Sequence, residues 1–587
     1  MSRPTLAAAV AAVSIAVLSW VLSDRPILDT DYFWHLRTGA LIADTGAVPQ
    51  VDPYSYSATG ARWIDLHWLF QLGLHQLYEL GGHAANRTAG FVLGLLVIGI
   101  SAVGLWRSDR AAVCGLALAL LVVTACVRFI LRPDTVSLVL AAAVLLLLRR
   151  DEVKSDRWVV AIVPIQLLWA NLHGFQAVGL ALVALALGAE LASPWLLGGR
   201  RVRRDRAQRL GLVLALGAAA ALVNPNGLDG ALLPFRQLTM IGPAETRGVF
   251  GHAIDELRSP LAALDVHSAP ALAAFAALAV LSLAALLLDR RGFSLFDALV
   301  WLAFFALALS AVRNIALFAV GAAPIFATHF ARWLDDTSRI PRARQRVAGV
   351  ATLAAIVVAV GAVVAVDAAR AGGPRGTSDP ALADFWFAER AVDWIARERP
   401  PGPIYHRMGD GGFLIWRLWP TYPVLADGRL EVYGEALYED LEVTGDGGPD
   451  TFQRLDARYR FGTALIHFGL FRDLSLLSWL GVQPEWRLVH LDEVAAVFVR
   501  VGPEGSVPWP AVNLGSAIVF EPLEPRPPHP IDLWRRKSRI SILTALGRID
   551  AARALLELSR AQYDDPVLEQ MRALLAQAPG GAEANPR

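Results

Sequence analysis

Two aspartates stand two positions apart in the segment DTDYFWHLRTG (29–39), which follows the first apolar run of the chain. Residues i and i+2 of an extended loop point to the same side, so Asp29 and Asp31 can bring two carboxylates together. Such a pair either raises the pKa of one carboxyl group or recruits a divalent cation such as Mg²⁺ or Mn²⁺. The alternative is that the two residues cap a helix or are solvated at the surface.

Three more residues close in sequence carry groups that can do chemistry. His35 lies four residues after Asp31 in an expected interfacial helix, 33–43, where it either orients the carboxylate or faces water. Asp52 precedes a proline and has the position of a turn residue. His67 adds an imidazole at the end of the same region.

The composition indicates a polytopic membrane protein. Of the 587 residues, 55% are hydrophobic and 18% are charged, and the mean hydropathy is +0.44. Several apolar runs approach the roughly 20 residues that a helix needs to cross a bilayer. The net charge of +1 argues neither for nor against nucleic acid, and no nucleic-acid partner is expected. Cys114 and Cys126 share one apolar run and predict neither a disulfide nor a metal site.

The apolar runs predict about eleven membrane spans. The start of the chain is interpreted as a retained first span rather than a signal peptide, because LSWVLSDRP (18–26) offers a poor small-residue cleavage site. The expected spans are 6–22, 88–106, 111–127, 134–148, 157–171, 175–197, 210–223, 269–288, 293–311, 313–331 and 347–366.

Arginine-rich loops alternate with loops that carry Asp, Asn and His. By the positive-inside rule the arginine-rich loops face the cytoplasm, which places the region after residue 366 outside. Asp, Asn and His are poor interfacial anchors, so their recurrence predicts a polar cavity that opens outward, although anchoring would explain any single residue. The outer set is Asp29, Asp31, His35, Asp52, Asp65, His67, Arg128, Arg132, Asp134, Asn171, His173, Asn224, Asn226, Glu256, Arg313 and Asn314.

The composition changes after residue 366. Short β-like runs at 403–406, 423–427, 463–468 and 494–500 alternate with amphipathic stretches, which predicts a small α/β domain. GDGG (409–412) lacks the pattern of a phosphate-binding loop, so no nucleotide cofactor is expected. The expected order is a membrane domain over 1–366 with a first outer loop at 24–87, the α/β domain over 367–502, a Pro-rich linker over 503–530 and a helical tail over 531–578.

The segment DTDYFWHLRTGALIADTGAVPQVDPYSYSATGARWIDLHWLFQLG (29–73) resembles the first outer loop of a large bacterial family of membrane proteins with the GT-C glycosyltransferase architecture. Relatives of that family include protein O-mannosyltransferases, oligosaccharyltransferases and lipid A aminoarabinose transferases. The resemblance continues through RPDTVSL, WANLHG, NPNG, RNIALFA, GGFLIWRLWP and VLADGRLEVYG, and spans 1–440. The family pattern carries Glu at the position of His67, which weakens an acid–base role there. In the tail, LGRIDAARALLE resembles part of a tetratricopeptide repeat (TPR).

The resemblance implies an α-helical, GT-C-like membrane domain of about eleven spans, a small outer α/β domain and a short TPR-like tail, in the bacterial inner membrane. It implies transfer of a sugar from a polyprenyl-phosphate carrier to an acceptor at the outer face. Asp29, Asp31 and His35 are then the catalytic candidates, with the two aspartates as tentative metal ligands. The substrate-binding candidates are Asp52, His67, Arg128, Arg132, Asn171, His173, Arg313 and Asn314.

Two other functions stay open. A non-catalytic membrane scaffold would keep the fold and recruit protein partners through its C-terminal helices. A transporter of lipid-linked glycans would need polar residues through the depth of the membrane, whereas in this sequence they gather on one side.

Overall fold

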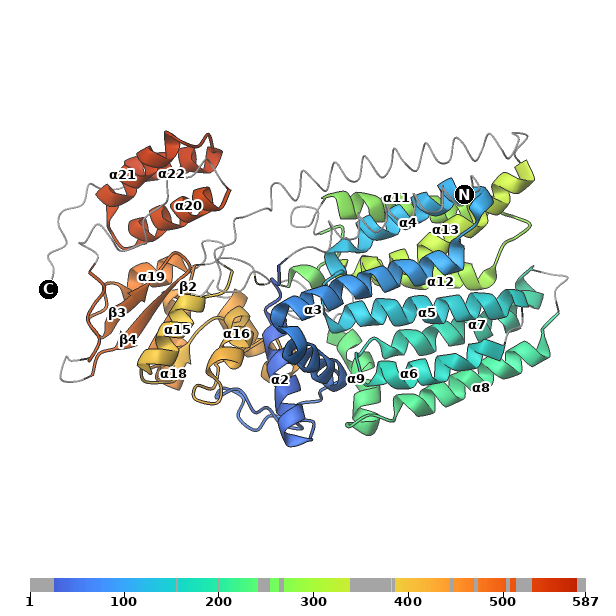
Figure 1. The fold of residues 1–587 in the computed structure, drawn as a ribbon, viewed down its shortest axis with the longest axis horizontal. Coiled ribbons are helices and arrows are strands. Elements are labelled where there is room, and N and C mark those ends of the chain that lie inside the picture. The colour runs from blue at the N-terminus through green and yellow to red at the C-terminus, as the bar shows by residue number, and fades with distance from the viewer. Residues whose placement is uncertain are drawn as a thin grey trace. The chain divides into compact units, whose positions relative to one another are not determined.

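The computed structural model describes residues 26–154, 157–197, 201–240, 254–262, 269–337, 382, 386–443, 448–468, 473–502, 507–513 and 530–577 (Figure 1). The chain divides into two compact units, which are described separately. Unit 1 comprises Met1–Arg25, Thr38–Val48 and Ile64–Ala368. Unit 2 comprises Pro26–Arg37, Pro49–Trp63 and Ala369–Arg587.

Unit 1 is helical throughout its described part. Four of its helical segments are long and apolar enough to cross a membrane, namely Trp68–Leu105, Gln176–Leu197, Pro270–Leu288 and Val312–Thr337. The first and last expected spans, 6–22 and 347–366, lie outside the described residues. The helices are α3 (Trp68–Leu105), α4 (Ala111–Ala125), α5 (Pro133–Lys154), α6 (Ile162–Ala170), α7 (Gln176–Leu197), α8 (Arg204–Ala221), α9 (Gly227–Met240), α11 (Ala269–Leu288), α12 (Leu295–Ser310) and α13 (Ile315–Thr337).

The centre of unit 1 is α13, which packs against α4, α11 and α12. Close approach of α12 depends on Gly321, because a Cβ there would lie 2.8 Å from the ring of Phe304. The start of α12 is fixed by Ser294, whose Oγ accepts a hydrogen bond from the backbone N of Asp297 at 3.2 Å. These contacts fix the packing of α12 on α13 and the position of the first turn of α12.

The segment expected as the first outer loop, 24–87, is largely helical. The expected helix 33–43 lies within α2 (Asp31–Thr45), and the first part of α3 follows from Trp68. At Gly82 the chain adopts a φ of 63°, which breaks α3 into two helical segments.

The loops that carry Asp, Asn and His lie at one end of the unit 1 helices, and the arginine-rich loops lie at the other end. At one end, Trp68 Nε1 donates to Asn171 Oδ1 at 2.9 Å. At the other end, Arg206 Nε donates to Asp151 Oδ2 at 2.7 Å. The 22 residues of α5 run from the first end to the second, a length of about 33 Å. The alternation of loop types in the sequence is therefore a separation in space, and the side of the membrane that each end faces stays a prediction.

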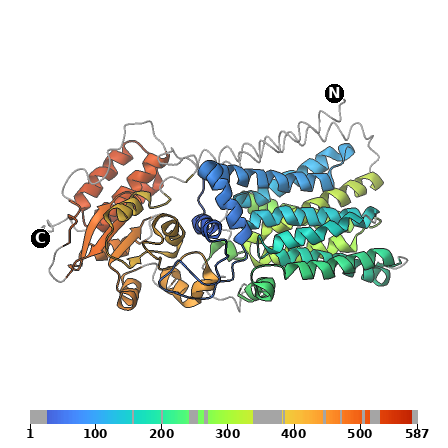
Figure 2. The same cartoon turned by 60° about the horizontal axis from the view of Figure 1, so that its bottom comes forward.

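Unit 2 contains a four-stranded sheet of order β1-β2-β4-β3. β1 is parallel to β2, with Ile404 beside Thr463, and the other two pairings are antiparallel. The strands are β1 (Ile404–Tyr405), β2 (Thr463–His467), β3 (Trp486–Leu491) and β4 (Ala495–Arg500), and the helices are α15 (Glu389–Glu398), α16 (Met408–Leu418), α17 (Leu430–Tyr438), α18 (Pro449–Tyr459) and α19 (Leu474–Leu480). Figure 2 shows the same elements from a second side.

Three of the expected strands are confirmed, and one is wrong. The run at 423–427 forms no strand of the sheet, because only Val424 makes an isolated bridge, with Ser55. β3 was not expected, since its polar residues Arg487 and His490 interrupt the apolar run.

The tail of unit 2 folds into three helices, α20 (Pro530–Ala545), α21 (Ile549–Arg560) and α22 (Pro566–Gln577). They enclose a small core of Ile540, Ala552, Leu556, Leu568 and Leu575. The likeness of this tail to a tetratricopeptide repeat stays a prediction.

Candidate functional site

Three arginines of the expected outer set lie together in unit 1. Arg128 ends a short 3₁₀ turn, Cys126–Arg128, and Arg132 precedes the start of α5 at Pro133. Thr135 Oγ1 donates to the carbonyls of Arg128 and Ile130, both at 2.6 Å, and so fixes the turn between the two arginines.

Glu256 pairs with two of these arginines. Its Oε2 lies 2.9 Å from Arg128 Nη1 and 3.1 Å from Arg132 Nη1. Burial alone would raise the pKa of Glu256, but the charges of Arg128, Arg132 and Arg313 outweigh burial and hold that pKa well below its usual value. Glu256 is therefore ionised at neutral pH.

Arg313 is the third arginine, in the 3₁₀ turn Val312–Asn314 that precedes α13. Its guanidinium carbon lies 5.8 Å from the ring centroid of Phe175, a cation–π arrangement. Its Nε is buried and has no hydrogen-bond partner among the described residues. Arg128 also pairs with Asp134 at 3.4 Å, so among the described pairs of the cluster three arginines accompany two carboxylates, one positive charge more than negative charges. An anionic group would balance that charge.

Two histidines lie next to this cluster, with ring centroids 5.4 Å apart. Ser137 Oγ accepts a hydrogen bond from Trp169 Nε1 at 2.8 Å and lies 2.8 Å from His173 Nδ1. Burial lowers the pKa of His67 to about 4, and burial together with the nearby positive charges lowers the pKa of His173. Both imidazoles are therefore neutral at pH 7. If the Ser137 O–H donates a hydrogen bond to His173 Nδ1, the neutral ring carries its proton on Nε2.

The two candidate asparagines hold helix ends. Asn171 Nδ2 donates to the carbonyls of Leu167 and Val223, both at 2.8 Å, and so joins the ends of α6 and α8. Asn314 Nδ2 donates to the carbonyl of Leu307 at 3.0 Å near the end of α12. Their amides position the site, and the arginines supply its charge.

The candidate catalytic residues Asp29 and Asp31 belong to unit 2, at the start of α2. Asp29 Oδ1 accepts from the backbone N of Asp31 at 3.1 Å, and Asp31 Oδ1 accepts from Trp34 Nε1 at 3.1 Å. The buried ring of His35 lies against Trp34, with centroids 3.6 Å apart and ring planes inclined by 32°. A Cβ at Gly428 would collide with Asp31 Oδ1, so the glycine lets the loop 427–429 approach the aspartate.

No group of three or more His, Cys, Asp or Glu side chains suited to a metal ion occurs in the described part of the chain. Asp29 and Asp31 by themselves supply two carboxylates. A cation held there would take its remaining oxygen ligands from substrate or water.

Asp52 joins a buried ion-pair network, a participation that its place in the sequence did not indicate. Arg429 Nη2 lies 2.7 Å from Asp52 Oδ1 and 2.6 Å from Asp427 Oδ2, and Tyr433 OH donates to Asp427 Oδ2 at 2.6 Å. The guanidinium stacks on Trp63, 4.6 Å from the ring centroid. The expected turn at Asp52 is also present, because its carboxylate accepts from the backbone N of Tyr54 at 3.1 Å. These contacts account for the burial of Asp52, and its role in substrate binding stays a prediction.

Comparisons with known proteins give solved structures that resemble this chain. No protein-family model matches the sequence, and no curated protein matches it either. The chain is similar in structure to ArnT from Cupriavidus metallidurans, solved with undecaprenyl phosphate bound, at 17% sequence identity and a TM-score of 0.47, with 88% of this chain and 99% of that chain covered.

Proposed function

We propose that this protein transfers a sugar from a polyprenyl-phosphate carrier to an acceptor at the outer face of the bacterial inner membrane. The observation that carries the proposal is the arginine cluster of unit 1. Arg128, Arg132 and Arg313 outnumber the two described carboxylates that pair with them, and the buried Nε of Arg313 has no hydrogen-bond partner among the described residues. Arginine forks suit a phosphate, because they offer paired N–H donors in the geometry of its oxygens.

In the proposed reaction, the bond between the anomeric carbon and the phosphate oxygen breaks, and a bond from that carbon to an acceptor oxygen or nitrogen forms. The arginines hold the phosphate that leaves with the carrier. Asp29 takes the acceptor proton or stabilises the positive charge that develops on the sugar, and Asp31 tunes Asp29. A divalent cation, Mg²⁺ or Mn²⁺, bound by both aspartates is part of the proposal.

The proposal also requires that Asp29 and the arginines contact one phosphosugar. The aspartates belong to unit 2 and the arginines to unit 1, so this meeting stays a prediction. An experimental structure with the carrier bound would test it directly.

Carrier binding tests the observation behind the proposal. We expect Arg313→Gln to bind polyprenyl phosphate about tenfold more weakly than the wild type, since a charge-assisted contact is lost. The matched control is Arg236→Gln, because Arg236 is an exposed arginine on α9 of the same unit. Binding would be measured with the purified full chain in detergent, beside a thermal-unfolding curve of each variant. Equal affinity of Arg313→Gln and wild type would refute the assignment of the phosphate site.

A further inference from the structure

A cavity of about 970 Å³ lies in unit 1, at the end of the helices opposite to the Arg128 cluster. The last turns of α3, α5 and α7, the first turns of α8 and α12, and the last part of α13 line it. Its size falls within the range of ligand-binding pockets, roughly 300–1,000 Å³.

The lining of this cavity is strongly basic. Eight of its residues are Arg or Lys, and three are Asp or Glu. When the described charged groups that pair with these residues, directly or through a shared carboxylate, are added, the cations in this set outnumber the carboxylates by three. Those groups are Arg110, Arg209, Asp109, Asp151, Asp289 and Asp335.

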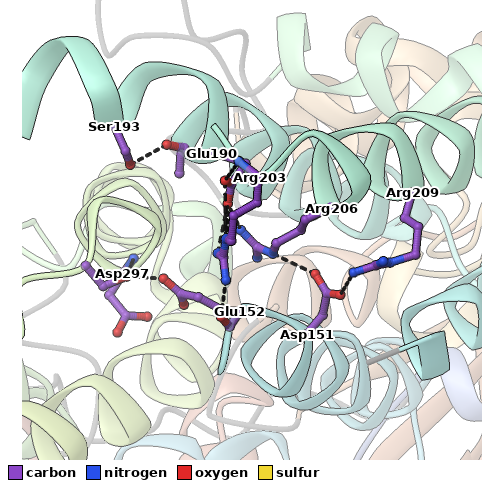
Figure 3. A network of polar contacts seen from close by, with 10 residues as sticks. Asp151, Glu152, Glu190, Ser193, Arg203, Arg206, Arg209 and Asp297 are labelled. Atoms are coloured by element: carbon purple, nitrogen blue, oxygen red, sulfur yellow. Dashed lines mark hydrogen bonds and ion pairs between the residues drawn. The ribbon is translucent and has the colours of Figure 1, made fainter. Parts of the chain in front are cut away.

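Ion pairs within the lining orient its arginines (Figure 3). Glu190 of α7 accepts from Arg206 Nη1 at 2.6 Å and pairs with Arg203 Nη2 at 2.8 Å. Arg206 also donates through Nε to Asp151 Oδ2 at 2.7 Å. The side chain of Arg206 is only 2% exposed, and its Nη2 has no hydrogen-bond partner among the described residues. A buried guanidinium nitrogen without a partner is costly, and an anion in the cavity would satisfy it.

A purely structural ion-pair cluster would explain part of this arrangement. It would account for Arg203 and Arg206, whose charges Glu190 and Asp151 match. It does not account for Lys154 and Arg201, which line the same cavity and pair with no carboxylate in the described ranges. Both residues are exposed, so their charges attract an anion at the mouth of the cavity.

Two exposed valines line the cavity beside its exposed cations. Val103 and Val153 are 72% and 73% exposed, at the ends of α3 and α5. Since α3 is one of the helices long and apolar enough to cross a membrane, acyl chains would cover such residues while a headgroup entered the cavity.

We propose that this arginine-lined cavity binds the phosphate group of an anionic ligand, supplied by an anionic phospholipid of the bilayer. The site is separate from the proposed reaction centre and does not depend on the proposed function. Its binding of lipid would stabilise the helix ends of α5, α7, α8 and α12 that meet around it.

The test compares a double variant, Lys154→Gln with Arg201→Gln, with the control Arg291→Gln. Arg291 is 87% exposed and does not line the cavity. The full chain would be purified in detergent and mixed with phosphatidylglycerol, phosphatidylcholine or inorganic phosphate, and bound lipid would be counted by native mass spectrometry. We expect wild type and Arg291→Gln to retain phosphatidylglycerol but not phosphatidylcholine, and the double variant to bind it about tenfold more weakly.

Thermal unfolding distinguishes the source of the phosphate. Stabilisation by phosphatidylglycerol that is lost in the double variant supports the lipid. Equal stabilisation by inorganic phosphate, again lost in the double variant, supports the same phosphate site with a soluble ester as its ligand. Equal retention of phosphatidylglycerol by the wild type and the double variant, or no preference over phosphatidylcholine, would overturn the proposal.

Discussion

At the scale of residues, two arginines show why sequence alone did not separate structure from function. Both Arg313 and Arg429 stand beside polar neighbours in short turns. Arg429 pairs with Asp427, two residues before it, and with Asp52, which lies far away in the chain. Arg313 Nε and Arg429 Nη1 are both buried without a hydrogen-bond partner among the described residues. The pairing of Asp52 with Arg429 is a long-range contact, so it could not be predicted from spacing.

Asp29→Asn tests the proposed catalytic carboxylate, since it keeps the size of the side chain and removes its charge. The amide oxygen can still accept the hydrogen bond that Asp29 Oδ1 takes from the backbone N of Asp31. We expect sugar transfer from membrane lipid extract to fall by about a hundredfold or more, the usual scale for loss of a general base. Thermal stability of the same purified variant serves as the control. Full activity in a well-folded variant would contradict the catalytic role of Asp29 and favour the alternative function, a non-catalytic membrane scaffold.

The lowered pKa of His67 predicts that the free energy of unfolding decreases in acid. Its pKa is lowered to about 4 in the folded protein by burial, whereas an unfolded histidine titrates near 6.5. The unfolded chain therefore binds a proton between these values that the folded chain does not, and stability falls as the pH falls through that window. The loss is at most about 3 kcal/mol for one group. Unfolding curves at pH 7, 5.5 and 4 should show a shallower pH dependence for His67→Gln, and an unchanged dependence would contradict this origin.

At the scale of elements, periodic apolar runs predicted helices well and short strands unevenly. The expected span 134–148 corresponds to α5, which continues to Lys154 because Asp151 and Arg149 find ion-pair partners inside unit 1. The wrong strand at 423–427 is apolar and β-like in sequence, yet the sheet offers it no neighbouring strand. Tertiary pairing decides such short segments, and local propensity does not.

The tail helix α20 depends on one buried carboxylate. Glu493 Oε1 lies 2.7 Å from Arg535 Nη2 and also pairs with Arg539, while Ser538 Oγ donates to the carbonyl of Glu493 at 2.7 Å. Burial raises the pKa of Glu493, but the two arginines outweigh burial and lower it, so the charged form is bound.

We expect Glu493→Gln to destabilise the docking of α20 by about 3 kcal/mol, because the variant removes the buried carboxylate with which both Arg535 and Arg539 pair. Hydrogen exchange of α20 should become faster in this variant. The control is Glu557→Gln on α21, an exposed carboxylate whose loss should change little. Equal exchange of α20 in both variants would show that Glu493 does not hold the helix.

At the scale of the whole molecule, the charge pattern carried more information than any single motif. The alternation of loop types predicted that polar and arginine-rich residues would separate, and in unit 1 they lie at opposite ends of the helices. Spacing along the chain could predict this because consecutive helices reverse direction. It could not predict the Arg128–Glu256 pair or the cavity at the other end, since both depend on how helices far apart in sequence pack together.

The orientation of these two ends in the membrane is the prediction on which the proposed function depends. Because arginine-rich loops stay in the cytoplasm, alkaline phosphatase fused after Asp134 or after Val366 should be exported and active. Fusions after Lys154 or after Arg204 should stay inactive, because both positions lie in arginine-rich loops of the opposite end. Immunoblots of each fusion would control for its amount. Active fusions after Lys154 and Arg204, with inactive ones after Asp134 and Val366, would place the Arg128 cluster in the cytoplasm. A carrier presented at the outer face could then not reach it.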